Sequence, residues 1–187
     1  QRTQSTPYLN VLIQLSVNSD NTLTDQGDTT ITTDRCDEGA IGIGNGFIVT
    51  AFQKEDALLY VRAYKWNSSS NSYSASSVVQ VTTYEAADCA IGYCTKDSKF
   101  VLIFRAPASS NAIKGCFLTL TESGGTPSVS VGTISSSGDP TDTQKAALYY
   151  DSGIGELVAY YVGGSGSAGR AKVKRVNSTG SNFAWGT

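Results

Sequence analysis

Short apolar runs bounded by Gly, Ser, Asn, Asp or Pro recur along the whole chain. One of them reads CAIGYC from Cys89, and the turn TKDSK separates it from the apolar run FVLIFR, which starts at Phe100. Runs of this length with turn residues between them are typical of strands, and no long apolar pattern of period 3.6 appears. The pattern predicts an all-β fold with almost no helix.

The apolar runs fall into strand types that follow one another in a fixed order. The first type reads GAIGIG, CAIGYC and AALYYD, starting at Gly39, Cys89 and Ala146. The second type reads FIVTAF, FVLIFR and LVAYYV, and turns of Gly, Asn, Asp, Ser or Lys join it to the first. Each such pair of runs is predicted to form a β-hairpin.

A third and a fourth strand type complete each repeat. The third reads NVLIQLSVN, LYVRAYKWN, GCFLTLTE and GRAKVKRVN, and its last residues, Asn18, Asn67, Glu122 and Asn177, are 49, 55 and 55 residues apart. The fourth reads DTTITT, SVVQVTT, SVSVGTI and NFAWGT. Four antiparallel strands in about 50 residues are the size of one β-propeller blade.

The repeats predict a single all-β domain over residues 1–187. It would hold three units, at 34–83, 84–136 and 140–187, preceded by a partial unit at 1–33. The expected fold is a β-propeller-like array of about 3.5 to 4 four-stranded antiparallel blades, with a β-sandwich as the alternative. An incomplete first unit would leave an unpaired strand edge, through which the chain could associate with itself.

The segments AALYYDSGIGELVAYYVGG, CAIGYCTKDSKFVLIFRA and SVSVGTISSSGD carry a resemblance to a known kind of repeat. They resemble the degenerate β-propeller repeats of extracellular and viral-fibre recognition proteins, over about three quarters of the chain. The resemblance rests on hydrophobic positions and turns, so it implies a fold more firmly than an activity.

The balance of charges and several other features of the sequence limit the expected binding partners and the expected cellular location. Lys and Arg number 14 against 16 Asp and Glu, so neither nucleic acid nor an acidic membrane surface is an expected partner. No apolar stretch approaches the roughly 20 residues of a membrane-spanning helix. The chain begins with Gln1, has four cysteines and carries two glycosylation sequons, which together predict a secreted, extracellular protein.

The cysteines are predicted to be structural. In a strand, Cys89 and Cys94 are an odd number of positions apart, so their sulfurs point to opposite faces and each needs another partner. Four cysteines allow three connectivities, and we favour Cys36 with Cys89 and Cys94 with Cys116. Nothing nearby in the sequence would activate a thiolate.

Catalysis is limited by the absence of histidine, which excludes Ser-His-Asp and Cys-His mechanisms. Carboxylates that could serve a glycosidase occur near the first strands, at Asp34, Asp37, Glu38, Glu85 and Asp88. The sequence assigns no facing pair among them, although a glycosidase requires one. The aspartates elsewhere do not match a calcium-binding loop, so no metal and no cofactor is expected.

Aromatic side chains are the best candidates for ligand binding. Tyr64, Trp66, Tyr73 and Trp185 lie on or beside predicted strands, where a ring could stack on a sugar or on a partner protein. The tryptophans adjoin polar turns, which makes them the first to test. The sequons place glycosylation at Asn67 and Asn177, at corresponding turns of two units.

These observations predict a secreted, non-enzymatic recognition or adhesion module that binds carbohydrate or an extracellular protein. One alternative is a structural subunit of an extracellular fibre or surface assembly. The other is a carbohydrate-active enzyme.

Overall fold

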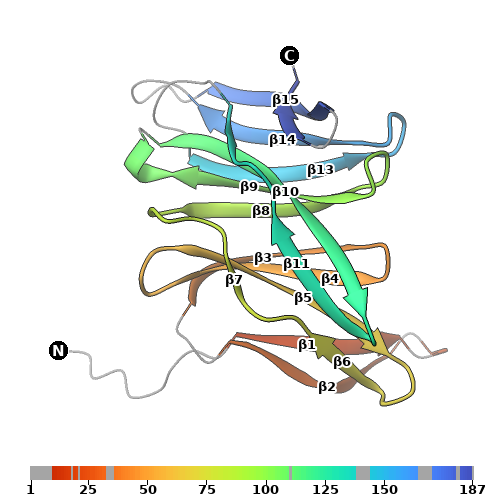
Figure 1. Cartoon of the computed structure of the whole chain (residues 1–187). Helices are drawn as coiled ribbons and strands as arrows, with labels where there is room; N and C mark the ends of the chain where they lie inside the picture. Colours follow the sequence, from red (N-terminus) through yellow and green to blue (C-terminus); the bar gives the residue numbers. More distant parts are fainter. Residues whose placement is uncertain are drawn as a thin grey trace.

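The structure is a computed structural model that describes residues 10–17, 19–20, 22–32, 36–109, 111–137, 144–163, 170–179 and 182–186. The prediction of an all-β protein is confirmed, since these residues form antiparallel strands and no α-helix. The strands are grouped into four sheets (Figure 1).

The sheets follow the chain in order. The first is a pair formed by β1 (Asn10–Val17) and β2 (Leu23–Thr32). Sheet I holds β3 (Cys36–Gly44), β4 (Phe47–Lys54), β5 (Leu59–Asn67), β6 (Ser72–Ala75) and β7 (Val79–Gln80). Sheet II holds β8 (Ala87–Cys94), β9 (Lys99–Ala106), β10 (Ala112–Ser123), β11 (Thr126–Val131) and β12 (Ser135–Ser136). Sheet III holds β13 (Gln144–Asp151), β14 (Glu156–Gly163), β15 (Arg170–Thr179) and β16 (Asn182–Trp185).

The turns explain why neighbouring runs pair as hairpins. Between β3 and β4 the chain turns at Asn45 and Gly46, whose φ angles are 49° and 75°. Positive φ at both central residues defines the two-residue turn that matches the twist of a hairpin, and Asn-Gly is its preferred sequence. This turn sets the register of the hairpin, in which Gly44 pairs with Phe47 next to the turn and Cys36 pairs with Lys54 at the open end. One irregularity in the pairing lies near the open end.

The fourth strand of sheets I and II is interrupted, which the sequence did not reveal. In sheet I the predicted strand SVVQVTT contributes only β7, while the polar segment SYSA forms β6. Both strands pair with β5, on either side of a break. Sheet II shows the same break, since β11 and β12 both pair with β10. A corresponding backbone hydrogen bond follows β6, β11 and β16, where the amides of Ser76, Gly132 and Gly186 donate to the carbonyls of Ala63, Phe117 and Arg175 at 2.9, 2.9 and 2.8 Å.

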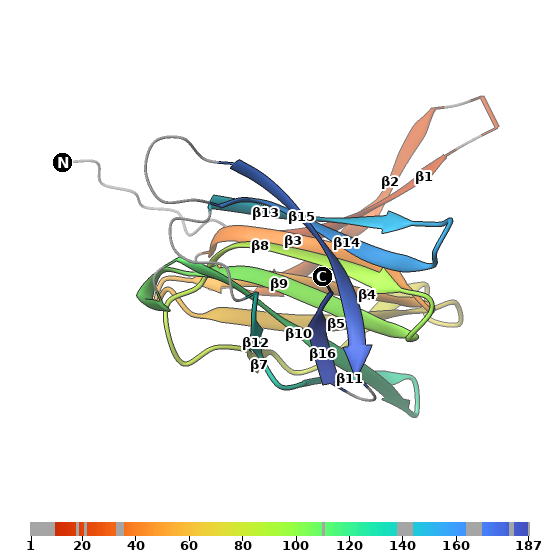
Figure 2. The same cartoon turned by 90° about the horizontal axis from the view of Figure 1, so that it is seen from above.

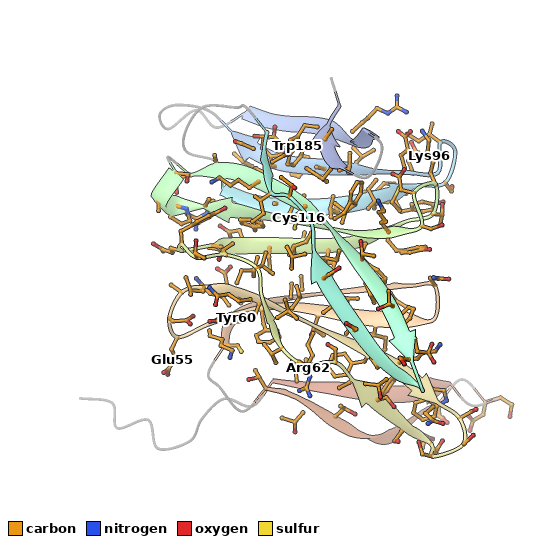
Figure 3. All side chains as sticks on the ribbon, viewed as in Figure 1. Glu55, Tyr60, Arg62, Lys96, Cys116 and Trp185 are labelled. Carbon is orange, nitrogen blue, oxygen red and sulfur yellow. The ribbon has the colours of Figure 1, made fainter. Side chains whose placement is uncertain are left out.

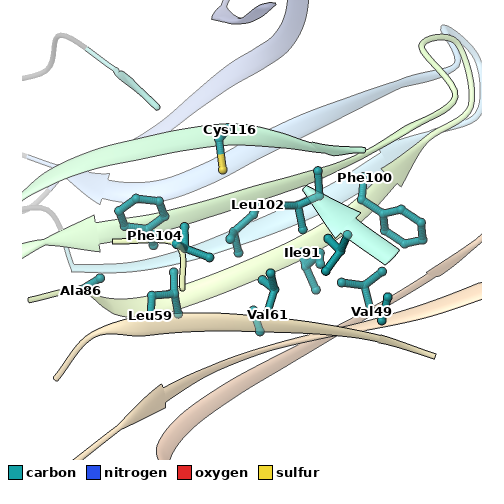
Figure 4. Close-up of a cluster of buried hydrophobic side chains, with 14 of the residues drawn as sticks. Val49, Leu59, Val61, Ala86, Ile91, Phe100, Leu102, Phe104 and Cys116 are labelled. Atoms are coloured by element: carbon teal, nitrogen blue, oxygen red, sulfur yellow. The ribbon is translucent and has the colours of Figure 1, made fainter. Parts of the chain in front are cut away.

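The sheets stack face to face and enclose two hydrophobic cores (Figures 1 and 2). The core between sheets I and II includes Leu59, Val61, Leu102 and Phe104, all fully buried (Figure 4). The core between sheets II and III includes residues of the opposite face of sheet II, such as Ile103. Sheet II is therefore apolar on both faces.

The first strands of the three large sheets, β3, β8 and β13, lie next to one another without pairing. Strands β3 and β8 run in the same direction, since Gly42 lies against Ile91 and Gly44 against Tyr93. The described strands form no closed barrel or closed ring.

Candidate functional site

A pocket of about 370 Å³ lies where β3, β8 and β13 begin. Its lining residues are Glu38, Gly39, Asp88, Cys89 and Ala146, so all three large sheets contribute to it. Binding sites are commonly concave and lie where several structural units meet, so this pocket is the candidate functional site.

Irregular strand pairing opens this end of the strands. The register shifts between Cys36 and Glu38 in β3 and between Ala87 and Ala90 in β8. A corresponding shift lies between Gln144 and Ala146 in β13. Such β-bulges re-aim side chains and are over-represented next to functional sites. Three bulges at one end of the stack therefore direct polar groups into a shared space.

The polar groups of the pocket are tied together across two sheets. Asp88 has a φ of 49°, and its amide donates a hydrogen bond to the carboxylate of Glu38. Arg105 donates from Nε to Oδ2 of Asp88 at 2.5 Å and from Nη1 to Oδ1 of Asn111 at 3.0 Å. The pair of Arg105 and Asp88 is partly buried, with side-chain exposures of 23% and 21%. The site combines two carboxylates with one guanidinium, which leaves it net acidic.

The thiol of Cys89 lines this pocket but is not activated. Burial, reinforced by the negative charge of Glu38, raises its pKa to about 12. A cysteine acts as a nucleophile or metal ligand through its thiolate, which this pKa excludes at neutral pH. Cys89 therefore contributes an uncharged thiol to the lining of the pocket.

None of the four cysteines is joined to another by a disulfide, so the predicted bridge between Cys36 and Cys89 is wrong for this structure. The contacts of Gly42 with Ile91 and of Gly44 with Tyr93 place Cys89 beside Ala40. Cys36 lies four residues earlier on β3, roughly 13 Å along an extended strand. That separation exceeds what a disulfide spans.

The predicted bridge between Cys94 and Cys116 is wrong for a different reason. Cys94 belongs to the core between sheets II and III, whereas Cys116 points into the core between sheets I and II (Figure 4). The two sulfurs thus lie on opposite faces of one sheet. Cys94 instead donates to Oδ2 of Asp97, with the sulfur 3.4 Å away. Burial raises the pKa of both thiols, that of Cys116 to about 12.

Two of the predicted ligand-binding aromatics pack against other side chains, Tyr64 fully buried and Trp185 partly buried. Tyr64 is 0% exposed, under the guanidinium of Arg62. Trp185 packs edge-on against Phe183 and donates its indole N–H to the carbonyl of Ser135 at 3.3 Å (Figure 3). The ring of Tyr64 is therefore not available for stacking on a ligand, whereas the role of Trp185 stays a prediction.

The other predicted aromatics, Trp66 and Tyr73, lie opposite each other on β5 and β6. Their ring centroids are 5.0 Å apart in an edge-on arrangement, and both side chains are half-buried. The pair lies on strands at the far edge of sheet I from β3, so it does not join the pocket. Its predicted role in ligand binding stays a prediction.

The two glycosylation positions are only partly described. Asn67 ends β5, and its Oδ1 accepts the amides of Ser69 and Ser70 at 3.0 and 3.4 Å in an exposed turn. The backbone of Asn177 pairs with Ala184, but its side chain lies outside the described residues. Glycosylation at both positions stays a prediction.

Several features of the pocket are visible only in three dimensions. Glu38 and Asp88 were candidate carboxylates in the sequence, but nothing there indicated that they converge. The role of Arg105 was missed, and a cation opposite a carboxylate 17 residues away in the chain gives no local signal. Among the described residues, no group of three or more Cys, Asp or Glu side chains could hold a metal ion.

The part of the chain that the structure describes contains no helix long and apolar enough to cross a membrane. Comparison with known protein families, with curated proteins and with solved structures finds no match to this chain.

Proposed function

We propose that the protein is a non-enzymatic recognition module that works outside the cell and binds carbohydrate in the pocket at the start of β3, β8 and β13. In this proposal sheets I, II and III are successive blades of a propeller-like array, with their first strands innermost. The observation that carries the proposal is the convergence of Glu38 and Asp88, from neighbouring sheets, on one polar pocket.

Three features support a blade-like arrangement of the sheets. The first strands carry glycine where neighbouring sheets approach, as Gly42 does beside Ile91. The strand order in each large sheet starts from the strand that contacts its neighbours and moves outward. A corresponding backbone hydrogen bond follows β6, β11 and β16, the fourth-position strands of the three large sheets.

The chemistry of the pocket suits a polyhydroxylated ligand. Carboxylates accept hydrogen bonds from hydroxyl groups, and charged acceptors form stronger bonds than neutral ones. Arg105 holds Asp88 in place, so its remaining lone pairs are pre-oriented for a ligand. Preorganised polar groups in a partly apolar pocket are a common basis of specificity in small-ligand sites.

Binding is favoured over catalysis by the same contacts. Cys89 is protonated at neutral pH and cannot act as a nucleophile. Asp88 is paired with Arg105, and Glu38 accepts the amide of Asp88, so both carboxylates have structural partners. The carbohydrate-active enzyme remains the alternative that sugar-release measurements would reveal.

An extracellular location is part of the proposal and is supported by Asn67, which lies at an exposed turn. The cysteines no longer add to this support, since they form no disulfide in the structure. Expression through a secretory pathway tests it directly. A glycan should be found on the secreted wild-type chain and should be lost at this position in Asn67→Gln.

The binding proposal is tested with a glycan array followed by calorimetry on the glycans that bind. Glu38→Gln and Asp88→Asn keep the side-chain shape but remove the charge, and each should weaken binding about tenfold or more, equivalent to roughly 1.4 kcal/mol. Glu122→Gln is the matched control, because Glu122 pairs with Lys65 away from the pocket. Equal affinity in all four proteins would overturn the proposed site, and release of free sugar would overturn the non-enzymatic function.

A further inference from the structure

The two carboxylates of the pocket differ in their partners. Oδ2 of Asp88 accepts a hydrogen bond from Nε of Arg105 at 2.5 Å, so the charge of Asp88 is compensated within sheet II. Glu38 is half-buried, and its Oε2 accepts the backbone amide of Asp88, which is neutral. No cationic side chain of the described residues forms an ion pair with Glu38. One negative charge of the pocket is therefore left without a counter-charge.

The thiol of Cys89 shows the sign of the electrostatic potential in the pocket. Burial, the charge of Glu38 and, to a smaller extent, the charge of Asp88 raise the pKa of this thiol to about 12. A negative charge at this position is thus destabilised by the two carboxylates as well as by burial. A positive charge at the same position would be stabilised by the carboxylates, because the interaction only changes sign. The pocket is therefore suited to a cationic group of a ligand.

A primary ammonium fits the acceptors of the pocket better than a metal ion does. In the part of the chain that the structure describes, no group of three or more Cys, Asp or Glu side chains could hold a metal ion. An ammonium needs fewer charged acceptors, because one of its N–H groups can bind a carboxylate while the others bind neutral oxygens. Glu38 offers Oε1 for this contact, since the described residues donate no hydrogen bond to that oxygen.

The size of the pocket suits a small polar ligand. Its volume of about 370 Å³ lies near the lower end of the roughly 300–1,000 Å³ that is typical of small-molecule sites. Gly39 and Ala146 line it without bulky side chains, which leaves room for a sugar ring beside the carboxylates. An amino group on such a ring could therefore lie next to Glu38.

We propose that the pocket selects carbohydrates that carry a free amino group, and that the ammonium binds the carboxylate of Glu38. The selectivity rests on the proposed carbohydrate-binding function and narrows its ligand to one class of sugar. Glu38 provides the selectivity, whereas Asp88, which is paired with Arg105, accepts hydrogen bonds from hydroxyl groups. Acetylation of the amino group removes its charge, so acetylated and neutral sugars bind more weakly.

The probes are three trisaccharides with the same linkage, built from glucosamine, N-acetylglucosamine or glucose. They differ in one substituent of each ring, which is an amino, an acetamido or a hydroxyl group. Calorimetry at about pH 6 keeps the amine protonated and the carboxylates ionised. The wild-type chain should bind the glucosamine probe about tenfold or more tightly than either of the others. In Glu38→Gln the affinities for the probes should lie within about threefold of one another, because the charge that separates them is gone.

Glu122→Gln is the matched control, since it removes a carboxylate outside the pocket and should keep the preference for glucosamine. Circular dichroism and thermal unfolding check that each variant retains its fold, and the comparison of probes on the wild-type chain depends on no variant. Equal binding of the probes to the wild type, or a preference that persists in Glu38→Gln, would overturn the proposed selectivity. The carbohydrate site itself would stand if binding still depended on Glu38 and Asp88. Absence of binding to these probes and to every glycan of the array would overturn both proposals.

Discussion

Strands β3 and β8 have nearly the same sequence pattern but different surroundings. In β8, Ile91 is 8% exposed and packs on Gly42 of sheet I. In β3, the equivalent Ile41 is 50% exposed, and no glycine-bearing strand of the described residues lies beneath it. The difference shows that burial of the first strand depends on the neighbouring sheet rather than on the strand itself. An apolar pattern alone therefore does not identify a core residue in a stacked array.

The largest expected effect comes from truncating the two equivalent isoleucines. Ile91→Ala should lower the free energy of unfolding by about 2–5 kcal/mol, because it removes buried methyl groups and leaves a cavity. Ile41→Ala should change it by no more than about 0.5 kcal/mol, as is usual at exposed positions. Urea unfolding of both variants measures the difference.

The matched pair is its own control, since both variants make the same chemical change. A similar loss of stability in the two proteins would show that Ile41 is covered in solution. The contrast between β3 and β8 would then disappear.

A second loss of stability is expected when a side chain is added at Gly44, where β3 contacts β8. In Gly44→Ala the added Cβ overlaps Cβ and Cγ of Tyr93, the base of a side chain that cannot swing aside. Overpacking of this kind should cost about 1–3 kcal/mol of stability. Gly39→Ala is the control on the same strand, because its Cβ would meet only the carbonyl oxygen of Ala51 at 3.4 Å. Equal thermal stability of the two variants would contradict close contact between β3 and β8.

The sequence predicted most strands because their signals are local. The alternation of apolar runs with turn residues located the β3–β4 and β8–β9 hairpins, and Asn45–Gly46 is a turn signal in its own right. The polar segment Ser72–Ala75 was missed, because its pairing with β5 depends on the partner strand and not on apolar side chains. Interruption of the fourth strand was missed for the same reason.

Relations between sheets could not be predicted from one sequence. The bridge between Cys36 and Cys89 was wrong because the stagger between β3 and β8 sets Cys89 beside Ala40. The bridge between Cys94 and Cys116 was wrong because the two sulfurs lie on opposite faces of sheet II. Glu38 and Asp88 were named as separate carboxylates, but they are 50 residues apart and meet only through the bulges at the strand starts. Tyr64 was taken for a surface ring, since alternation does not show whether both faces of a sheet are covered.

A third prediction concerns the half of sheet I that β2 does contact. Arg62 donates from Nε to the carbonyl of Ser76 at 2.9 Å and from Nη1 to that of Ile31. Arg62→Met keeps the aliphatic length but leaves these partly buried carbonyls without their donor, which should cost about 1–3 kcal/mol. Hydrogen exchange should show the amides of β2 losing protection before those of β9. Unchanged exchange in β2 would mean that Arg62 does not hold the β1–β2 pair on sheet I.

The smallest effect tests the other difference between the two hairpins. The β3–β4 turn has two residues, whereas the β8–β9 turn is longer and carries Lys96, which reaches Glu156 of sheet III (Figure 3). Arg175 also donates to Glu156, from Nη2 at 2.6 Å. Hydrogen bonds from Lys96 and Arg175 lower the pKa of Glu156 below its ordinary value of 4.5. The ionised carboxylate therefore stabilises the fold at pH values above about 4.5, and this contribution is lost as the pH falls through the lowered pKa.

Glu156→Gln removes the charge and with it this pH dependence. The urea midpoint of the variant should lie below that of the wild type at pH 7, and the gap should narrow as the pH falls below 4.5. Glu122→Gln should show a smaller gap at pH 7, because the Glu122 carboxylate is 31% exposed against 7% for Glu156 and solvent screens it more. A gap for Glu156→Gln that persists unchanged at pH 3 would assign its effect to side-chain packing. The ion pair between Lys96 of the β8–β9 turn and Glu156 of sheet III would then not stabilise the fold. The β8–β9 turn would differ from the β3–β4 turn only in its length.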